Sequence, residues 1–417
     1  MPLGAYRISS YTLGGGGSQA PSTAVSYLLE SNTPGTQASP FLTAPDGSGN
    51  FYLAWNSHGS NGTNSIRCTV LKIASDGTIT WQKTHGNSTI TTSGPGGLRV
   101  LANGNVAITG TYTTTSSFTL VLDPSNGNIL YQNTSQITAA SGPVARGLGY
   151  TSGSTAYGYA YDSNQATMAV QSITSSGTLS ARHYSGSTVT MNQTGGAADS
   201  NIFAHYSTYS AGNSSTQIFS YDGTTFTSVG AYGQNLSSVP RGLTVDSSNN
   251  IYIVDTGRNI VKLNSSGTIQ WQKLLNQGSF ISRQISTDGT NVFVMATVSN
   301  AYYVMAFDCS TGAITWQNKL SATGKTLNSL AGISHSGNQI YVLGNNGTDD
   351  TVMALNVPKD GTGTGTYGIY TYATSTDFTV SNQTFTSASS QTFSSNSATA
   401  NNNLISTGTP TFTMTKY

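Results

Sequence analysis

The sequence repeats one short pattern four times, as Gly77-Thr-Ile-Thr-Trp81, Gly127-Asn-Ile-Leu-Tyr131, Gly267-Thr-Ile-Gln-Trp271 and Gly312-Ala-Ile-Thr-Trp316. In each copy a turn glycine precedes a short strand segment that ends on an aromatic residue, and glutamine follows the aromatic. Weaker copies begin at Gly177, Gly223 and Gly361. The seven glycines are 44 to 50 residues apart, with a mean of about 47. This period is typical of propeller and solenoid repeats.

The composition predicts an all-β chain. Charged residues make up 7% of the sequence, and Glu30 is its one glutamate. Helices favour Glu, Lys, Ala and Leu. This chain instead uses Thr, Ser, Val, Ile, Tyr, Gly and Asn, which are typical of strands and tight turns.

Each repeat has room for four short strands, and seven such units predict a seven-bladed β-propeller over residues 38–373. A four-stranded sheet cannot bury both faces alone, whereas radial stacking buries both. We therefore expect the tryptophan of each outer strand to cover apolar surface between adjacent blades, which makes Trp81, Trp271 and Trp316 structural, and Tyr131 is the aromatic of the same repeat position.

Two extensions flank the predicted propeller, an N-terminal arm at 1–37 and a β-rich C-terminal tail at 374–417. The arm contains the flexible run Gly14-Gly-Gly-Gly17 and the apolar group Tyr27-Leu-Leu29, a candidate closing strand beside blade 7. The tail alternates apolar and polar residues at Phe378-Thr-Val380 and Phe412-Thr-Met414. It is either an ordered extension that docks on another subunit or on the propeller itself, or a solvated tail.

The net charge of +1 and the pI of about 7.7 provide no global field for nucleic acid or an anionic membrane. No apolar run approaches the roughly 20 residues needed to span a bilayer. Cys68 and Cys309 lie in different repeats, and we expect two buried free thiols rather than a disulfide.

The uncharged Ser, Thr, Asn and Gly surface is typical of extracellular proteins, yet the first ten residues lack the pattern of a secretory signal. A virion protein, made in a host cytoplasm and released by lysis, reconciles the two observations. A mature chain whose signal has been removed would reconcile them as well.

Three resemblances follow from these residues. Residues 240–263, which include Pro240-Arg-Gly-Leu and Ile251-Tyr-Ile-Val-Asp255, resemble an NHL-type propeller repeat, and the Gly-x-Ile-x-Trp-Gln copies resemble repeats of quinoprotein-like propellers. The polar surface and the tail Thr411-Phe-Thr-Met-Thr-Lys-Tyr417 resemble structural proteins of tailed-phage virions, in particular marine ones. The first two imply a fold and no particular activity, because propellers host many unrelated functions.

The sequence contains no convincing catalytic or metal motif. Glu30 lies outside the blades, Asp349-Asp350 is typical of a solvated hairpin tip, and Asp246 and Asp255 match structural turn aspartates of the NHL-like pattern. The histidines have no zinc-type spacing; they are His58, His85, His183, His205 and His335. We therefore expect no metal, no cofactor (a quinone included) and no enzymatic activity.

Four arginines form the one candidate ligand site. Arg146, Arg241 and Arg283 lie near the start of predicted inner strands, and Arg99 lies close by in blade 2. If the inner strands line a central channel, these side chains could gather at its mouth and bind phosphate, sulfate or a carboxylated glycan. The favoured alternative is that each arginine caps a carbonyl between blades.

These observations favour a non-enzymatic virion structural protein of a tailed phage, either a tail component or a head decoration. The expected partners are other virion proteins in an oligomeric assembly, reached through the terminal arms, and a host surface glycan. The alternative hypothesis is a secreted or surface-exposed bacterial propeller that binds carbohydrate. An enzyme would need acids or histidines that converge in the channel.

Overall fold

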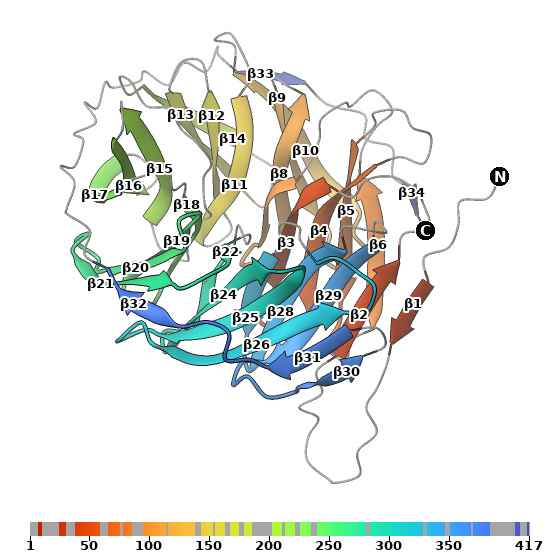
Figure 1. The fold of residues 1–417 in the computed structure, drawn as a ribbon. Helices are drawn as coiled ribbons and strands as arrows, with labels where there is room; N and C mark the ends of the chain where they lie inside the picture. Colours follow the sequence, from red (N-terminus) through yellow and green to blue (C-terminus); the bar gives the residue numbers. More distant parts are fainter. Residues whose placement is uncertain are drawn as a thin grey trace.

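The computed structural model describes most of the repeat region and parts of both termini (Figure 1). The described residues are 7–10, 25–30, 38–58, 66–75, 78–85, 95–113, 116–137, 143–152, 155–162, 167–174, 179–185, 202–210, 213–221, 226–234, 240–280, 284–327, 332–346, 351–367, 370–383, 405–408 and 415–416. They contain strands and turns and no helix, and therefore no helix that could cross a membrane. The fold is all-β and propeller-like, as the sequence predicted.

Within these ranges the strands form seven sheets, which we number in chain order. Sheet 1 contains β3 (Ala38–Pro45), β4 (Phe51–His58), β5 (Ile66–Ile73), β6 (Ile79–His85) and β34 (Thr415–Lys416). Sheet 2 contains β7 (Pro95–Val100), β8 (Val106–Thr113), β9 (Ser116–Leu122), β10 (Ile129–Ile137) and β33 (Ile405–Gly408). Sheet 3 contains β11 (Pro143–Ser152), β12 (Thr155–Asp162), β13 (Thr167–Thr174) and β14 (Leu179–Ser185).

Sheet 4 contains three described strands, β15 (Ile202–Ser210), β16 (Asn213–Tyr221) and β17 (Phe226–Gln234). Sheet 5 contains β18 (Pro240–Val245), β19 (Ile251–Asp255), β20 (Asn259–Leu263), β21 (Ile269–Leu275) and β32 (Val380–Asn382). Sheet 6 contains β22 (Ser279–Phe280), β23 (Ser286–Thr287), β24 (Asn291–Val298), β25 (Ala301–Asp308), β26 (Ile314–Ala322), β30 (Gly365–Tyr367) and β31 (Tyr370–Thr374). Sheet 7 contains β27 (Gly332–Ser336), β28 (Gln339–Asn346), β29 (Thr351–Pro358), β1 (Arg7–Ser10) and β2 (Val25–Glu30).

The first strands of the sheets contact one another in chain order. β3 contacts β7, β7 contacts β11, β11 contacts β15, and β15 contacts β18. β18 then contacts β23, β23 contacts β27, and β27 contacts β3. Figure 1 shows the same succession as a change of colour from orange through yellow and green to cyan.

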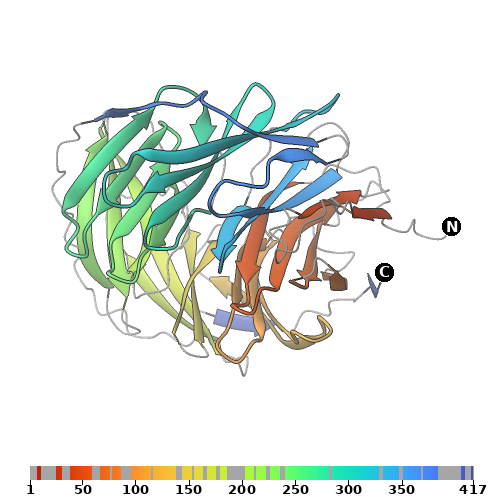
Figure 2. The same ribbon diagram turned by 90° about the horizontal axis from the view of Figure 1, so that it is seen from below.

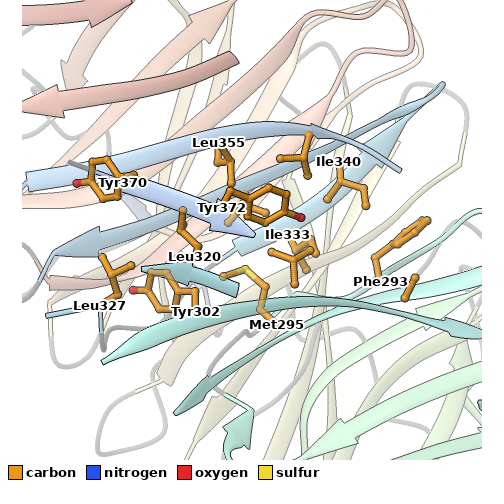
Figure 3. Packing of buried hydrophobic residues seen from close by; sticks show 14 residues of the cluster. Phe293, Met295, Tyr302, Leu320, Leu327, Ile333, Ile340, Leu355, Tyr370 and Tyr372 are labelled. Carbon is orange, nitrogen blue, oxygen red and sulfur yellow. The ribbon is translucent and has the colours of Figure 1, made fainter. Parts of the chain in front are cut away.

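The hydrophobic core lies between successive sheets, because alternate residues of a strand face opposite neighbours. Met295 and Tyr302 of sheet 6 face sheet 7 and pack with Leu355 (Figure 3), whereas Val294 and Tyr303 of sheet 6 pack toward sheet 5. Further clusters join sheet 1 to sheet 2, sheet 7 to sheet 1, and sheet 4 to sheet 5. A sheet that is covered on both faces explains the nearly continuous apolar runs in its strands.

Asparagine and aspartate close the turns between first and second strands. The carboxylate of Asp46 accepts the backbone N–H groups of Ser48 (2.8 Å) and Asn50 (3.1 Å). In sheet 5 the carboxylate of Asp246 accepts those of Ser248 and Asn250, both at 2.9 Å. A short side chain that satisfies its own turn needs no partner elsewhere, so this chemistry suits an exposed repeat turn.

Three tryptophans of the repeat pattern bind the next sheet, as the sequence predicted. The indole N–H of Trp81 donates to the carbonyl oxygen of Pro124 in sheet 2, at 3.0 Å. Trp271 donates to Cys309 in sheet 6, and Trp316 donates to Lys359 in sheet 7, each also at 3.0 Å. Each tryptophan therefore ties the outer strand of one sheet to a turn of the next.

The repeat glycines form the surface on which these indoles lie. Gly127, Gly312 and Gly361 have φ angles of 72°, 69° and 80°, a left-handed conformation that side chains disfavour. A Cβ atom at Gly127 would lie 2.6 Å from the Trp81 ring, and Cβ atoms at Gly312 and Gly361 would lie 2.8 Å and 2.7 Å from the next two indoles. The glycine of one repeat is thus required by the tryptophan of the preceding repeat.

Other members of the pattern behave differently or lie elsewhere. Gly267 adopts the same left-handed conformation, with a φ of 80°. Tyr131 is 42% exposed, and its neighbour Leu130 is similarly exposed, so this aromatic is not buried as Trp81 is. Gly77, Gly177 and Gly223 lie outside the described residues.

The N-terminal arm contributes strands to sheet 7. β2 pairs antiparallel with β29, and Tyr27 lies opposite Ala354, which confirms the predicted strand beside the seventh repeat. β1 in turn pairs with β2. The structure differs at the other end of that repeat. Residues 370–373, which the sequence assigned to the end of the propeller, belong with Thr374 to β31 and pair with β26 of sheet 6.

The described parts of the C-terminal tail lie on the sheets of the same chain. After β31, the segment crosses to sheet 5, where β32 pairs with β21 (Figure 2). Gln317 holds Phe378 between the two sheets: its Oε1 accepts the Phe378 N–H at 2.9 Å, and its Nε2 donates to the Phe378 carbonyl at 2.8 Å. Of the two alternatives for the tail, these residues follow the docked one.

Candidate functional site

The first strands of sheets 1, 6 and 7 meet in a small polar cluster. The backbone N–H of Thr43 donates to Gln284 Oε1 at 3.0 Å, and Gln284 Nε2 donates to the Thr43 carbonyl at 3.2 Å. The Thr43 hydroxyl donates to the hydroxyl of Ser334 at 2.7 Å. Thr43 is 1% exposed, so these contacts satisfy polar groups that would otherwise be buried without partners.

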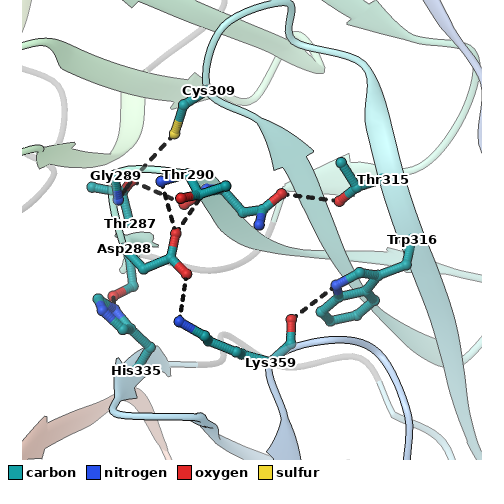
Figure 4. A network of polar contacts seen from close by, with 11 residues as sticks. Thr287, Asp288, Gly289, Thr290, Cys309, Thr315, Trp316, His335 and Lys359 are labelled. Atoms are coloured by element: carbon teal, nitrogen blue, oxygen red, sulfur yellow. Dashed lines mark hydrogen bonds and ion pairs between the residues drawn. The ribbon is translucent and has the colours of Figure 1, made fainter.

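A second polar cluster joins sheets 6 and 7 (Figure 4). The Ser286 hydroxyl lies 2.6 Å from Nδ1 of His335, and the His335 ring packs against Phe293 with 5.8 Å between ring centroids. A serine beside a histidine is a familiar nucleophile pair, but catalysis also needs a group that orients the histidine and an oxyanion site. The contact of Ser286 with His335 joins sheet 6 to sheet 7.

An ion pair lies beside this cluster. Lys359 Nζ is 2.9 Å from Asp288 Oδ2, while Asp288 Oδ1 accepts the backbone N–H groups of Thr290 and Asn291 (Figure 4). Burial alone would raise the pKa of Asp288, but these hydrogen bonds and the Lys359 ammonium outweigh it and lower the pKa. The carboxylate therefore stays ionised and binds sheet 7 to sheet 6.

Asp255 and Asp246 instead bind residues of their own turns. Asp255 accepts the backbone N–H of Asn259 at 3.1 Å and its side-chain amide at 3.0 Å. Burial opposes ionisation of Asp246, but hydrogen bonds from Asn250, Tyr252 and Ser248 lower its pKa. The structural roles predicted for Asp246 and Asp255 are confirmed, whereas Asp349-Asp350 lies outside the described residues.

The predicted arginine site is described in part. Arg99 in β7 and Arg241 in β18 are half-buried, and burial lowers the pKa of Arg241. Arg146 lies in β11 with its side chain outside the described residues, and Arg283 lies outside them altogether. The convergence of the four side chains stays a prediction.

The strand registers relate these arginines to one another. Arg146 and Arg241 occupy the same place in their sheets, a β-bulge in the first strand, where the register skips one residue. Gly96 occupies that bulge in sheet 2, so Arg99 is not the equivalent residue. Because bulges re-aim side chains, two of the four arginines share a defined local geometry.

An open hollow of about 490 Å³ lies on the outside of sheet 6. The outer strand β26 and the C-terminal segment form its walls, and Trp316 contributes an aromatic surface. Its lining residues are Ile314, Thr315, Trp316, Gln317, Thr374, Ser375, Phe378, Thr379 and Val380. An aromatic ring among neutral hydroxyl and amide groups suits an uncharged polar ligand.

Two cysteines and one histidine are titratable side chains buried inside the sheets. Cys68 and Cys309 are free and buried, as predicted, and burial raises the pKa of Cys68 to about 12. His85 is 1% exposed, and neither ring nitrogen has a hydrogen-bond partner among the described residues. Burial, with a contribution from Lys83, lowers the pKa of His85 to about 4, so this side chain is neutral near pH 7.

Sequence reasoning missed Thr43, Gln284, Ser334 and the Asp288–Lys359 pair. Their partners lie up to 291 residues apart, and no local pattern marks them. The one available signal was polar residues at first-strand positions between apolar neighbours, as in Leu42-Thr43-Ala44 and Ile333-Ser334.

Comparison with known proteins supports the repeat architecture. A family model described as outer membrane protein assembly factor BamB matches residues 218–407, which is under half of the chain and includes sheets 5 to 7. A search of curated proteins found no match.

Solved structures show similarity at low sequence identity. BamB from Moraxella catarrhalis is 14% identical, with coverage of 77% of this chain and 99% of that one and a TM-score of 0.38. A protein of unknown function from Bacteroides caccae is 12% identical, with 71% and 89% coverage and a TM-score of 0.36. The C-terminal WD40 domain of Sif2 is 9% identical, with 81% and 93% coverage and a TM-score of 0.44. The chain is an all-β, propeller-like protein, and its residues 218–407 are similar to the repeats that the BamB family model describes.

Proposed function

We propose that this protein is a non-enzymatic structural component of a tailed-phage particle, built as a closed seven-bladed propeller. The ring is supported by the first-strand contacts, which pass through all seven sheets and return from β27 to β3. It is also supported by the pairing of β2 with β29, which joins the N-terminal arm to the last sheet. Closure by strands from both ends of the chain removes the two free ends that an open array would have.

The observation that carries a structural role is the use of the described carboxylates. Asp46, Asp246, Asp255 and Asp288 hold turns or an inter-sheet ion pair, and the pKa values of Asp246 and Asp288 are lowered. A general acid needs the opposite shift, because it must hold its proton near neutral pH. Groups of this kind stabilise the fold, and a lowered pKa does not suit Asp246 or Asp288 to the role of a general acid.

The virion assignment is supported by the charge-poor surface rich in Ser, Thr, Asn and Gly. Such a surface exposes few lysines and arginines to proteases in an extracellular environment. The proposed contacts with other virion proteins fall to parts of the arms outside the described residues, because β1, β2 and β31 to β34 pair within the chain. The propeller would then face outward and stiffen the particle or contact the host surface.

Purified particles test this proposal directly. Mass spectrometry of gradient-purified virions is expected to detect the chain at a stoichiometry that matches a symmetric position in the tail or head. Electron microscopy after labelling with an antibody to the propeller is expected to place it on the particle exterior. Absence of the chain from purified particles would contradict the proposal.

A second candidate function, carbohydrate binding by a secreted or surface-exposed bacterial propeller, is favoured by the hollow beside Trp316. The test is a glycan array probed with the natural chain and with a variant that combines Thr374→Ala and Thr379→Ala, two exposed residues that line the hollow. Binding to neutral glycans that the variant loses would support this candidate. Binding to sulfated glycans that Arg241→Ala abolishes would instead place the site at the arginines, and no binding at all would rule out both.

A further inference from the structure

The outer junction of sheets 5 and 6 holds residues 375–383 in the way that a binding groove holds an extended peptide. This segment begins directly after β31, which pairs with the edge of sheet 6, and it contains β32, which pairs with the edge of sheet 5 (Figure 2). The segment therefore crosses from one sheet to the next on the outside of the molecule.

One aromatic side chain anchors the segment in the junction. Phe378 is 2% exposed and belongs to the hydrophobic cluster that sheets 5 and 6 share. Its ring meets that of Tyr303 edge-on, with 4.8 Å between the centroids. Gly278 provides space for the ring, since a Cβ atom at this position would lie 2.9 Å from Phe378. The junction thus contains a pocket for one large apolar side chain, and a side chain at Gly278 would fill it.

The residue before the anchor is bound through its charge and its carbonyl group. The Tyr303 hydroxyl donates to a carboxylate oxygen of Asp377 at 2.6 Å, and Lys319 Nζ lies 3.9 Å from the same oxygen. The backbone carbonyl of Asp377 accepts the side-chain amides of Asn276 (3.3 Å) and Gln277 (2.7 Å). Hydrogen bonds to an ionised acceptor are short and strong, so this site favours an acidic residue before the aromatic one.

Two side-chain amides bind the backbone of the segment. Gln317 binds both the N–H and the carbonyl oxygen of Phe378. Asn276 Oδ1 accepts the Thr379 N–H, and the Asn276 N–H donates to the Thr379 carbonyl, each at 3.1 Å. In strand addition, backbone hydrogen bonds of this kind supply affinity, and side-chain pockets supply specificity. The junction combines both.

The residues that form this groove belong to elements that precede the segment in the chain. Asn276 and Gly278 follow β21, Tyr303 lies in β25, and Gln317 lies in β26. Two copies of the chain have identical grooves and identical segments. The segment of one copy therefore fits the groove of another through the same set of contacts, which is the basis of exchange between copies.

We propose that this groove is a peptide-binding site for an Asp-Phe motif, and that residues 375–383 of a second copy occupy it when copies of the chain assemble. In a single chain the direct connection to β31 keeps the chain's own segment at a high effective concentration. Copies held side by side reduce that advantage, because exchange replaces each contact with an identical one. The proposal adds a contact between copies to the contacts with other virion proteins proposed above and does not depend on them.

A synthetic peptide tests the recognition. The peptide copies residues 374–383, carries a fluorophore, and is titrated against the full-length Phe378→Ser chain, whose own segment has lost its anchor. Fluorescence anisotropy is expected to show that it binds at least about tenfold more tightly than a matched Phe378→Ser peptide. The natural chain, whose groove is filled, is expected to bind it at least about tenfold more weakly than the variant does. Equal affinity for the two peptides would overturn the proposal.

Two variants that cannot dock their own segments test the second copy. The Phe378→Ser chain keeps the groove and loses the anchor, whereas the Gly278→Val chain keeps the anchor and fills the groove. Size-exclusion chromatography with light scattering is expected to show a monomer for each variant alone and a dimer for their equimolar mixture. The matched control is Gly47→Val, at a glycine of similar φ with no atom within 4 Å of an added Cβ. Mixed with Phe378→Ser it is expected to stay monomeric, because its segment fills its own groove.

Circular dichroism checks that the Gly278→Val chain folds. If it does not, a chain that combines Gln317→Ala with Asn276→Ala replaces it, because this change removes the amides that bind the segment and leaves Phe378 in place. Peptide binding together with a mixture that stays monomeric would mean that the groove serves only its own chain, which overturns the role of the second copy. These measurements use the purified chain, so their failure would leave the proposed place in a phage particle untouched.

Discussion

The outer strands of sheets 1 and 2 carry the same sequence pattern, yet their aromatic residues lie in opposite environments. Trp81 is 8% exposed and donates its indole N–H to Pro124 of the next sheet, whereas Tyr131 is 42% exposed. The sheet 1 indole also lies against Gly127, which has no side chain to displace it. The motif therefore needs two residues on neighbouring sheets. One is an aromatic with an N–H donor, and the other is a turn glycine without a side chain on the next sheet.

Substitution of the two aromatics gives the largest expected difference. Trp81→Ala removes a buried ring and a hydrogen bond and is expected to lower the free energy of unfolding by about 3–5 kcal/mol. Tyr131→Ala removes an exposed ring and is expected to cost under about 1 kcal/mol. Urea unfolding followed by circular dichroism measures both. Similar losses in the two variants would mean that Tyr131 is buried as Trp81 is.

Substitution of Gly127 tests whether the Trp81 ring needs a neighbour without a side chain. Gly127→Ala places a Cβ atom 2.6 Å from the Trp81 ring and is expected to cost about 3 kcal/mol, because it adds a collision to a strained backbone. Gly47→Ala is the matched control, since Gly47 has a φ of 77° and no atom within 4 Å of an added Cβ. It is expected to cost about 1–2 kcal/mol for the backbone conformation alone. Equal losses would show that the indole moves aside easily.

His85 gives this first junction a dependence on pH at a position where the outer strands of sheets 5 and 6 have leucine. It stands four residues after Trp81, where those sheets have the buried Leu275 and Leu320. Its folded pKa of about 4 lies below the ordinary 6.5, so the unfolded chain binds a proton first as the pH falls. Stability is full above pH 6.5 and falls by up to about 3 kcal/mol between pH 6.5 and pH 4.

The variant His85→Leu is expected to remove most of this dependence of the unfolding free energy on pH. Unfolding free energies at pH 7 and pH 4.5 measure it. Aspartates with lowered pKa values lose their contribution mainly below 3.8, outside this window. An unchanged slope in the variant would assign the pH dependence to another group.

The ion pair at the junction of sheets 6 and 7 gives the smallest expected effect. Lys359→Met keeps the carbonyl that Trp316 binds and removes the ammonium next to Asp288. The Lys359 side chain is one-third exposed, so the expected loss is about 1 kcal/mol and is smaller still in high salt. A loss above that of Gly127→Ala would show that charge, rather than the indole, dominates the junction.

Local patterns in the sequence were enough to predict the architecture. Gly312-Ala-Ile-Thr-Trp316 predicts a turn followed by an outer strand. The turn conformation requires the glycine, and packing against the next sheet requires the tryptophan. The role of Trp316 and the pairing of Tyr27-Leu-Leu29 with the last repeat followed from the same logic. Both inferences needed only a periodic sequence and unpaired sheet edges.

Contacts between residues that lie far apart in the sequence could not be predicted. Tyr370 belongs to sheet 6 because β31 pairs with the edge of β26. No residue near Tyr370 in the sequence indicates that partner. The side chain of Gln284 likewise binds the backbone of Thr43 across 241 residues of chain, and no local pattern marks that contact. Tyr131 shows that a local pattern can also mislead. It fits the repeat pattern, yet it is exposed and is not packed as Trp81 is.

The pairing of β2 with β29 sets an order for biosynthesis. Val25 lies opposite Asn356, so the earliest part of the chain needs a strand that the ribosome makes 331 residues later. At roughly 5–20 residues per second this delay is about 17 to 66 s, during which Val25–Glu30 lacks its β29 partner. A nascent chain that stalls before residue 351 therefore leaves β2 without β29, so the open edge of β2 is available to chaperones and to neighbouring nascent chains.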